Sequence, residues 1–219
     1  MNAIKTNEAV DHLRPYFHRE DYIKGHPQRG MLSTDKFQRV MLIPEELIEG
    51  LHRSLEEQTG HAWPIVAHTC GRKWGERLMR FWRVEWGHYY GLKIEDVQFP
   101  YFEVWLKEAF RFYGWGGLSL DFGLEDEGIL QVELEHSVLA RLLEGEVESD
   151  HVCEIFAGLL GSIFASLTRE ELSGLEVACA AGGHETCRFV VAREEYVEQG
   201  RQRRLDGGSP DDILEAIRG

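Results

Sequence analysis

The chain has 219 residues, of which 43% are hydrophobic, and its formal net charge is −14. This length suits one globular domain with appendages, and the apolar content is enough for a packed core. The acidic balance argues against a nucleic-acid-binding surface and against adsorption to anionic lipid. No apolar run approaches the roughly 20 residues that a membrane-spanning helix needs. With no targeting segment in view, we expect a cytoplasmic protein whose four cysteines stay reduced.

The first third of the chain is predicted to hold an arm, a strand and a helix. Residues 1–34 are polar and mixed, which favours an extended arm that packs on a second subunit or stays loosely ordered. A strand is predicted over residues 37–43. Pro44 then opens a helix and Gly60 ends it. The buried face of that helix is predicted to carry Leu47, Ile48, Leu51 and Leu55.

Two further helices are predicted in the middle of the chain. Apolar side chains recur at helical spacing over residues 61–90. Gly71 and Gly75 lie four residues apart there, so their face admits another backbone or a flat ligand, and tight helix packing is the favoured interpretation. The next helix is predicted over residues 100–113, with Phe102, Leu106 and Phe110 on one side.

Strands and one more helix follow. Strands are predicted over residues 114–122 and 129–135, and residues 139–148 form a connection or a short helix. An amphipathic helix is predicted over residues 153–167.

A hairpin and a tail complete the predicted elements. Its strands, residues 172–180 and 187–192, flank Gly182-Gly183. The polar tail ends in a short helix that starts at Pro210 and is capped by Ser209.

The pattern Cys-x22-Glu-x2-Cys-x7-Cys is formed by Cys153, Glu176, Cys179 and Cys187. Three thiols and one carboxylate complete a four-coordinate shell around a divalent ion, and thiolate-rich tetrahedral sites favour zinc. Cys179 and Cys187 flank the predicted turn and are therefore close in space. Glu176 and Cys179 would face opposite sides of a regular strand, so a shared site requires a bulge or a strand end near residues 178–179.

Other interpretations of the cysteines stay open. Lone cysteines are often small core residues, so Cys-x7-Cys alone matches two unrelated buried thiols equally well. A disulfide would form in an oxidising compartment. An iron–sulfur cluster held by Cys153, Cys179, Cys187 and one more ligand is an alternative cofactor, although Glu176 fits zinc better.

The cysteine and glutamate pattern, followed by Arg188-Phe-Val-Val191, resembles the 4-vinyl reductase domain. That family includes phenol-sensing transcription activators, archaeal stand-alone proteins and proteins linked to chlorophyll metabolism in phototrophs. Residues 70–75 (CGRKWG) and 114–122 (GWGGLSLDF) are similar to segments of the stand-alone members from phototrophs. The resemblance covers roughly residues 35–195, and the spacing of the four ligands resembles the zinc site of the sensor members.

The resemblance implies an α+β fold in which helices pack on one side of an antiparallel sheet. Such a fold is similar to TRAPP-type and nitric-oxide-signalling ligand-binding domains. We therefore expect an arm (1–34), a ligand-binding domain (35–195) and a C-terminal tail with a short helix (196–219). The family often dimerises, so a homodimer is expected as well.

All six tryptophans lie between residues 63 and 115, and phenylalanines and tyrosines crowd the same segment. A flat apolar ligand needs such a wall, although the pattern alone favours an aromatic core between helices and sheet. The resemblance shifts the expectation towards a pocket, because members of the family enclose a small-molecule cavity in this region. The predicted ligand-binding residues are Trp74, Phe81, Trp82, Trp86, Phe102 and Trp105.

A chlorophyll-type tetrapyrrole would need a histidine for its magnesium and cations for its carboxylates. The histidine candidates are His68, His88, His136 and His151, and the candidate cations are Arg72, Lys73, Arg77 and Arg80. Each of these is more often an ordinary surface or core residue.

Three functions are therefore predicted. The first is a zinc-containing protein that binds or carries a chlorophyll-type tetrapyrrole for biosynthesis or photosystem assembly. The alternatives are a vinyl reductase of chlorophyll biosynthesis and a sensor for small aromatic ligands. No Gly-x-Gly-x-x-Gly follows a strand, and four protein ligands leave no open metal position, so a non-catalytic protein is favoured and no catalytic residue is assigned.

Overall fold

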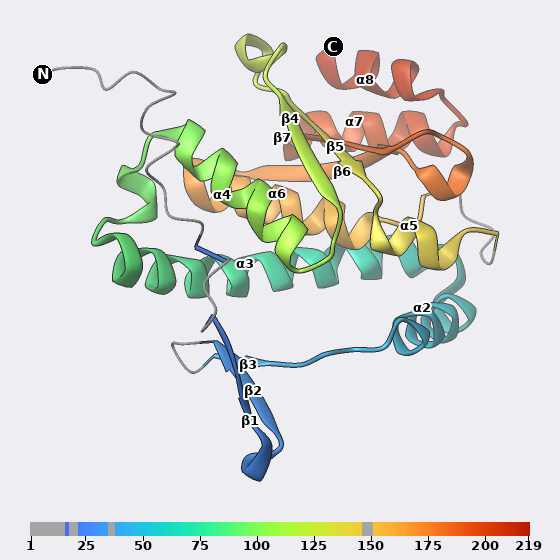
Figure 1. The fold of residues 1–219 in the computed structure, drawn as a ribbon. Coiled ribbons are helices and arrows are strands. Elements are labelled where there is room, and N and C mark those ends of the chain that lie inside the picture. The colour runs from blue at the N-terminus through green and yellow to red at the C-terminus, as the bar shows by residue number, and fades with distance from the viewer. Residues whose placement is uncertain (1–15, 18–21, 35–37, 146–150) are drawn as a thin grey trace, which may run out of the picture.

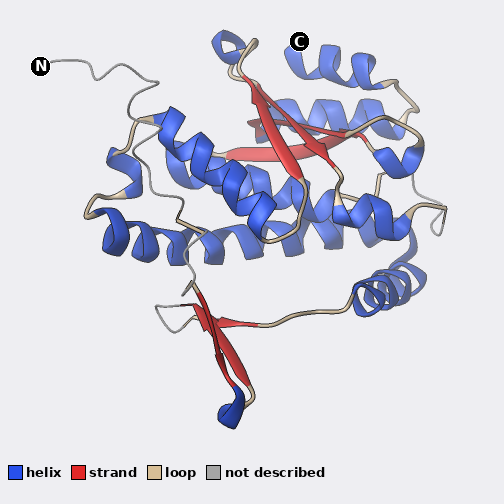
Figure 2. Ribbon diagram, viewed as in Figure 1, coloured by secondary structure: helices blue, strands red, loops and turns tan. Residues whose placement is uncertain are grey.

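The computed structural model describes residues 16–17, 22–34, 38–145 and 151–219. Within them the fold is α+β, as predicted, with two antiparallel sheets and helices around the larger one (Figures 1 and 2). No helix among these residues has both the length and the apolar character that a membrane span requires.

The larger sheet has the strand order β4-β5-β7-β6, and every neighbouring pair is antiparallel. Its strands are β4 (Gly117–Asp121), β5 (Leu130–Glu135), β6 (Leu172–Ala178) and β7 (Cys187–Arg193). Both predicted hairpins are therefore present, although β7 also pairs with β5 and so lies inside the sheet. Side chains of β6 and β7 are almost all buried, because helices cover both faces there.

One face of this sheet carries the long central helices. α6 (Glu154–Thr168) lies against β6 and against α3 (Trp63–Tyr90), and α4 (Phe99–Phe112) packs beside β4 (Figure 1). Glycines allow the close approach: a Cβ on Gly71 would lie 1.9 Å from the carbonyl oxygen of Ile155, and one on Gly158 would lie 2.1 Å from that of His68. The interpretation of Gly71 and Gly75 as tight helix packing is confirmed.

The other face is covered by the C-terminal helices α7 (Glu194–Leu205) and α8 (Pro210–Arg218). A second apolar core forms there, to which the sheet contributes Leu175 and Val190 and the helices contribute Val197 and Ile213. The predicted short helix is present, and Ser209 caps it in a capping box with Asp212. The polar segment before it, expected as a tail, forms α7.

A small second sheet and a separate helix lie on the N-terminal side. The sheet consists of β1 (Ile23–His26), β2 (Met31–Thr34) and β3 (Arg39–Val40), and the helix is α2 (Glu45–Thr59). A short helix, α5 (Val138–Leu143), follows β5, in place of the predicted connection. Short 3₁₀ turns lie at Pro27–Arg29, Gly60–Ala62, Ile94–Asp96, Glu125–Glu127 and Ala180–Gly182.

Two predictions in this region are wrong. The predicted strand over residues 37–43 is reduced to Arg39–Val40, with residue 37 outside the described part. The predicted buried face of α2 is exposed at three of its four positions: Leu47, Leu51 and Leu55. The reason is that α2 presents His52 to the body instead, where the indole N–H of Trp63 donates to its Nε2 atom at 2.9 Å.

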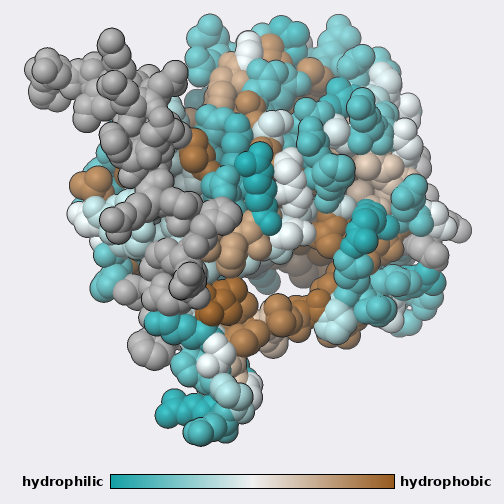
Figure 3. All heavy atoms as spheres, in the orientation of Figure 1, coloured by the Kyte–Doolittle hydropathy of each residue, from teal (hydrophilic) through white to brown (hydrophobic). Residues whose placement is uncertain are grey.

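The exposed side chains form a continuous apolar strap, defined here as Met41, Leu42, Ile43, Leu47, Leu51 and Leu55. Leu42 is 83% exposed and Leu51 is 52% exposed. Figure 3 shows this strap as a brown band between the small sheet and α2, with a gap between the band and the main body. The strap therefore contributes little to the core of its own chain.

Candidate functional site

The four predicted metal ligands meet in one buried cluster, called here the metal centre. Sγ of Cys153, Cys179 and Cys187 and a carboxylate oxygen of Glu176 all lie within 4.8 Å of one another, and all four residues are buried. Sγ of Cys187 is 3.8 Å from Sγ of Cys153 and 3.8 Å from Sγ of Cys179. The chain thus assembles a donor set that could hold a metal ion.

Local structure explains why these side chains converge. Cys153 is the N-cap of α6, and its backbone N–H donates to Oε2 of Glu176 at 2.8 Å. The β6–β7 register shifts between Glu176 and Ala178, and β6 ends before Cys179. The predicted bulge and strand end are therefore present, and they turn Glu176 and Cys179 to the same side.

The donors are arranged as a cation would require. Oε1 of Glu176 is buried without a hydrogen-bond partner among the described residues, while Oε2 is held. Burial raises the pKa of this carboxyl well above its usual range. Hydrogen bonds from the thiols of Cys153 and Cys179 lower the pKa of Cys187 to about 4, so this sulfur accepts as a thiolate. A buried anionic donor set of this kind is costly without a positive charge at its centre.

Neighbouring groups hold the ligands in place. The hydroxyl of Ser137 lies 3.3 Å from Sγ of Cys153, and the N–H of Ala180 donates to Sγ of Cys187 at 3.4 Å. From α7, Arg204 donates to the backbone oxygen of Glu176 at 2.9 Å and pairs with Glu154, the first residue of α6. Such partners orient the residues that hold a metal.

A second candidate site is the aromatic cluster, defined here as Tyr16, Phe17, Tyr22, Trp82, Trp86, Tyr89, Tyr90, Phe102, Trp105, Phe112 and Tyr113. Trp105 of α4 is its centre: its ring centroid lies 4.5 Å from that of Trp82 and 5.4 Å from that of Trp86. The stretch before β1 closes the cluster, because Phe17 lies 5.1 Å from Trp105 and 5.5 Å from Phe112, centroid to centroid.

This cluster contains buried polar atoms that lack partners. The indole N–H groups of Trp82, Trp86 and Trp105 and both carboxyl oxygens of Glu85 have no hydrogen-bond partner among the described residues. Burial raises the pKa of Glu85 to about 7. Burial also raises the pKa of the Tyr113 hydroxyl, and the charge of Glu85 adds to that rise. Native cores rarely leave such groups unsatisfied.

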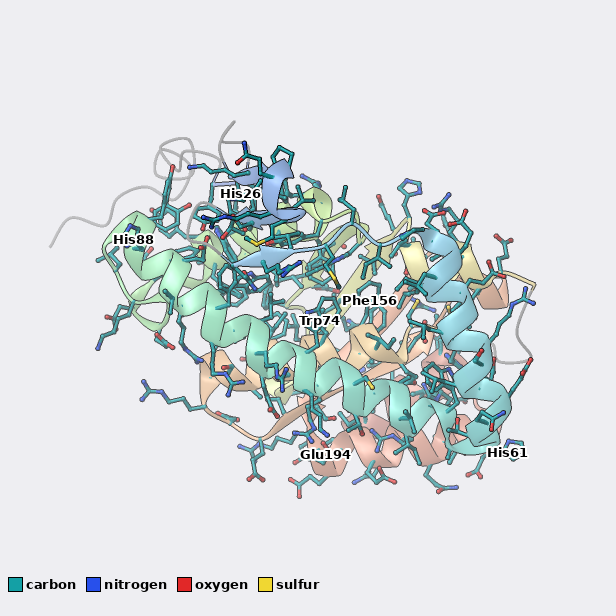
Figure 4. The ribbon with its side chains drawn as sticks, turned by 90° about the horizontal axis from the view of Figure 1, so that it is seen from below. His26, His61, Trp74, His88, Phe156 and Glu194 are labelled. Atoms are coloured by element: carbon teal, nitrogen blue, oxygen red, sulfur yellow. The ribbon has the colours of Figure 1, made fainter. Side chains whose placement is uncertain are left out.

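The six predicted ligand-binding residues do not form one group. Trp82, Trp86, Phe102 and Trp105 share the aromatic cluster. Trp74 instead contacts Trp115, 4.9 Å between centroids, and lies beside Phe156 of α6 (Figure 4). Phe81 is half-buried and packs against the core.

The polar candidates for a tetrapyrrole lie apart from the aromatic cluster. His88 and His136 are exposed, the first at the far end of α3 (Figure 4). Nε2 of His68 lies 3.0 Å from the carbonyl oxygen of Gly174. His151 is near the metal centre, and burial, followed by the charge of Arg204, lowers its pKa to about 3. The four basic residues of α3 are exposed: Arg72, Lys73, Arg77 and Arg80.

Sequence reasoning missed Tyr16, Phe17, Tyr22 and Glu85. The first three lie in the stretch expected to form a loose or partner-bound arm, yet all are buried. The run of three aromatic residues within 16–22 was the available signal. Glu85, between Val84 and Trp86 on a helix of mixed composition, carries no pattern that distinguishes it from a surface acid.

Comparison with known proteins supports part of the predicted resemblance. The family model of the vinyl-4-reductase domain matches residues 131–193, which include all four residues of the metal centre. No match was found among curated proteins. The family resemblance is thus supported over this segment, which is shorter than the predicted span of 35–195.

Three solved structures are similar. The phenol-responsive sensory domain of the transcription activator PoxR, in a crystal structure with phenol, is 15% identical, with a TM-score of 0.65 over 93% of this chain and 98% of that one. A trafficking protein particle complex subunit 3 from Naegleria fowleri, covalently bound to palmitic acid, is 17% identical, with a TM-score of 0.49 and coverages of 68% and 93%. A vinyl-4-reductase family protein from Methanocaldococcus jannaschii is 16% identical, with a TM-score of 0.46 and coverages of 69% and 82%. At these identities the likeness to the first structure concerns the fold.

Proposed function

We propose that the protein binds a small aromatic molecule in the aromatic cluster and uses one zinc ion to stabilise the adjoining core. The observation that carries this proposal is the set of buried, unpartnered polar atoms inside a wall of aromatic rings. Binding sites are mostly apolar, with a few polar groups that fix the orientation of the ligand. The similar sensory domain of PoxR was crystallised with phenol, a ligand of the same class.

Zinc is proposed because the donor set suits it. A tetrahedral ion with Zn–S bonds of about 2.3 Å holds its sulfurs about 3.8 Å apart. The two measured Sγ–Sγ distances at Cys187 are both 3.8 Å. A single ion thus fits better than the iron–sulfur alternative, in which several irons would separate the thiolates further. Four protein ligands make this a structural site, which when filled would hold the N-terminus of α6 against β6 and β7. Thiolate ligands also favour the reducing cytoplasm as location.

A single aromatic ring is proposed in preference to the expected tetrapyrrole. None of the four candidate histidines lies in the aromatic cluster, and the four candidate cations point to solvent. The rings of the cluster are already in contact, so a macrocycle would have to displace several of them, whereas one ring requires less rearrangement. The roles in chlorophyll metabolism, as carrier or vinyl reductase, therefore have less structural support than the sensor.

Tryptophan fluorescence tests the proposed binding directly, because Trp82, Trp86 and Trp105 line the site. We expect a saturable change when 4-ethylphenol is added, and its loss in Trp105→Phe. Trp63→Phe is the matched control, since Trp63 contacts His52 on α2 instead. An absence of saturable binding would contradict the proposal.

Native mass spectrometry of the protein from its own host tests the identity of metal and ligand. We expect one zinc per chain and an adduct with the mass of a single-ring compound. A tetrapyrrole-sized adduct would restore the carrier, and iron with sulfide in place of zinc would contradict the structural ion.

We further infer that two copies of the chain associate through the apolar strap. Exposed contiguous apolar surface of this kind marks interaction sites, and the strap lies clear of its own core (Figure 3). Sedimentation velocity should show a dimer that Leu51→Glu dissociates. Leu205→Glu, at an exposed leucine on α7, is the control and should leave the dimer intact. A wild-type monomer at micromolar concentration would disprove the dimer.

A further inference from the structure

Glu85 is a buried acid without a counterpart. Its side chain lies on α3 and only 1% of the residue is exposed. Neither carboxyl oxygen accepts or donates a hydrogen bond among the described residues, and no described cation pairs with it. A buried carboxyl that is neither paired nor hydrogen-bonded destabilises the protein that carries it. An apolar side chain at this position would avoid that cost, so the acid calls for a partner that the chain itself does not supply.

The surroundings of Glu85 indicate the chemistry of that partner. Trp82 and Trp86 lie three residues before and one residue after it on α3, and both rings contact Trp105. On the other side stands Tyr113, whose hydroxyl is 2.8 Å from that of Tyr22. The faces of indole and phenol rings are electron-rich and attract cations, most strongly when water is excluded.

The unpartnered groups are of two kinds, and one ligand has to serve both. An ionised carboxylate only accepts hydrogen bonds, whereas the indole N–H groups of Trp82, Trp86 and Trp105 only donate. A protonated amine supplies donors and a positive charge, and an oxygen atom supplies an acceptor. A neutral phenol would satisfy an indole N–H but would leave the carboxylate without a compensating charge.

We infer that the ligand of the aromatic cluster is a small aromatic amine that also carries an oxygen acceptor, bound as a cation with its ammonium group against Glu85. This inference rests on the proposed function and specifies its ligand class. The net charge of −14 acts in the same direction, because an acidic protein raises the local concentration of cations.

A matched pair of probes isolates the ammonium group. Tyramine and 4-ethylphenol share the ring and the hydroxyl, and tyramine adds the aminoethyl nitrogen. Isothermal titration calorimetry at pH 7.5, about half a unit above the pKa of Glu85, should show tyramine binding at least about tenfold more tightly, as expected for a charge-assisted hydrogen bond to a desolvated carboxylate.

Two variants assign the effect to Glu85. Glu85→Gln keeps the shape of the side chain and removes its charge, so it should weaken tyramine about tenfold while 4-ethylphenol stays within about twofold. Glu76→Gln is the control: it removes an exposed acid from the same helix, paired with Arg72, and should change neither affinity. The melting temperature of ligand-free Glu85→Gln should equal or exceed that of the wild type, which confirms that the variant folds.

The outcomes separate the two proposals. Equal or tighter binding of 4-ethylphenol, or an unchanged tyramine preference in Glu85→Gln, overturns the amine while the binding of small aromatic molecules stands. If neither probe binds the wild-type protein, the proposed function and the ligand class fall together.

Discussion

The metal centre and the aromatic cluster are both buried, but they differ in how far their polar groups are satisfied. At the metal centre one ion would satisfy all four side chains, which come from a segment of 35 residues, from Cys153 to Cys187. The aromatic cluster draws on residues 16–113 and leaves three indole N–H groups and one carboxyl without partners among the described residues. The first arrangement is typical of a permanent structural element, and the second of a site that exchanges its occupant.

The largest expected effect separates the two regions by removing the metal. Cys179→Ser should empty the metal centre and lower the free energy of unfolding by about 4 kcal/mol or more, because binding free energy at a structural zinc site is also folding free energy. Zinc content and thermal melting measure both changes. Cys70→Ser, at the exposed cysteine, should change neither. Full zinc content and an unchanged melting temperature in Cys179→Ser would refute the structural role.

The next effect concerns the cost of the unsatisfied acid. The folded pKa of Glu85 is about 7, against an ordinary value of 4.5. The folded protein therefore keeps a proton that the unfolded chain has already released. Relative to Glu85→Gln, the stability of the ligand-free wild type should be independent of pH below pH 4.5 and should fall by about 3 kcal/mol between pH 4.5 and pH 7. Above pH 7 the difference should stay constant.

Urea unfolding of both proteins across this range measures that difference. Groups that titrate in both proteins, such as His52, cancel in the comparison. Parallel curves for the two proteins would show that Glu85 is solvated or paired in the free protein, and the contrast with the metal centre would then disappear.

The smallest effect tests how far the two regions are coupled through α3. Gly71 lies opposite Ile155, two residues after Cys153, so a methyl group there must push α6 away. Gly71→Ala should cost about 1–3 kcal/mol and weaken metal retention, while binding at the aromatic end of α3 persists. Gly87→Ala, where the added atom meets nothing closer than 3.7 Å, should be neutral or stabilising. Equal losses of metal and aromatic ligand in Gly71→Ala would show one coupled unit.

The metal centre was predictable because its geometry is local. A turn signal at residues 182–183 brings Cys179 and Cys187 together, and the face rule for strands required the irregularity that is found between Glu176 and Ala178. The order of helices and strands also followed from periodicity. Long-range pairing did not: the insertion of β7 between β5 and β6 depends on which sheet edge meets which, and no local pattern encodes that.

The N-terminal third shows why the remaining predictions failed. On α2 the leucine spacing predicts a buried face, but burial depends on what lies opposite the helix, and the body receives His52 instead. Likewise, Tyr16 and Phe17 stand in a polar stretch, and their burial depends on rings of α3 and α4 that are distant in sequence. Helical periodicity identifies an apolar face but not its partner.

The pairing of Arg204 with Glu154 has a consequence for where the folding unit ends. The segment that matches the vinyl-4-reductase domain stops at residue 193, whereas Arg204 lies beyond it and reaches the backbone of Glu176 and the side chain of Glu154. A chain shortened to the matched segment would keep every metal ligand and yet leave a carboxylate uncompensated at the first turn of α6. The apolar face of the sheet that carries Leu175 and Val190 would also lose its cover. The smallest autonomous unit of this protein therefore extends through its last two helices, and the boundary of sequence similarity is not the boundary of stability.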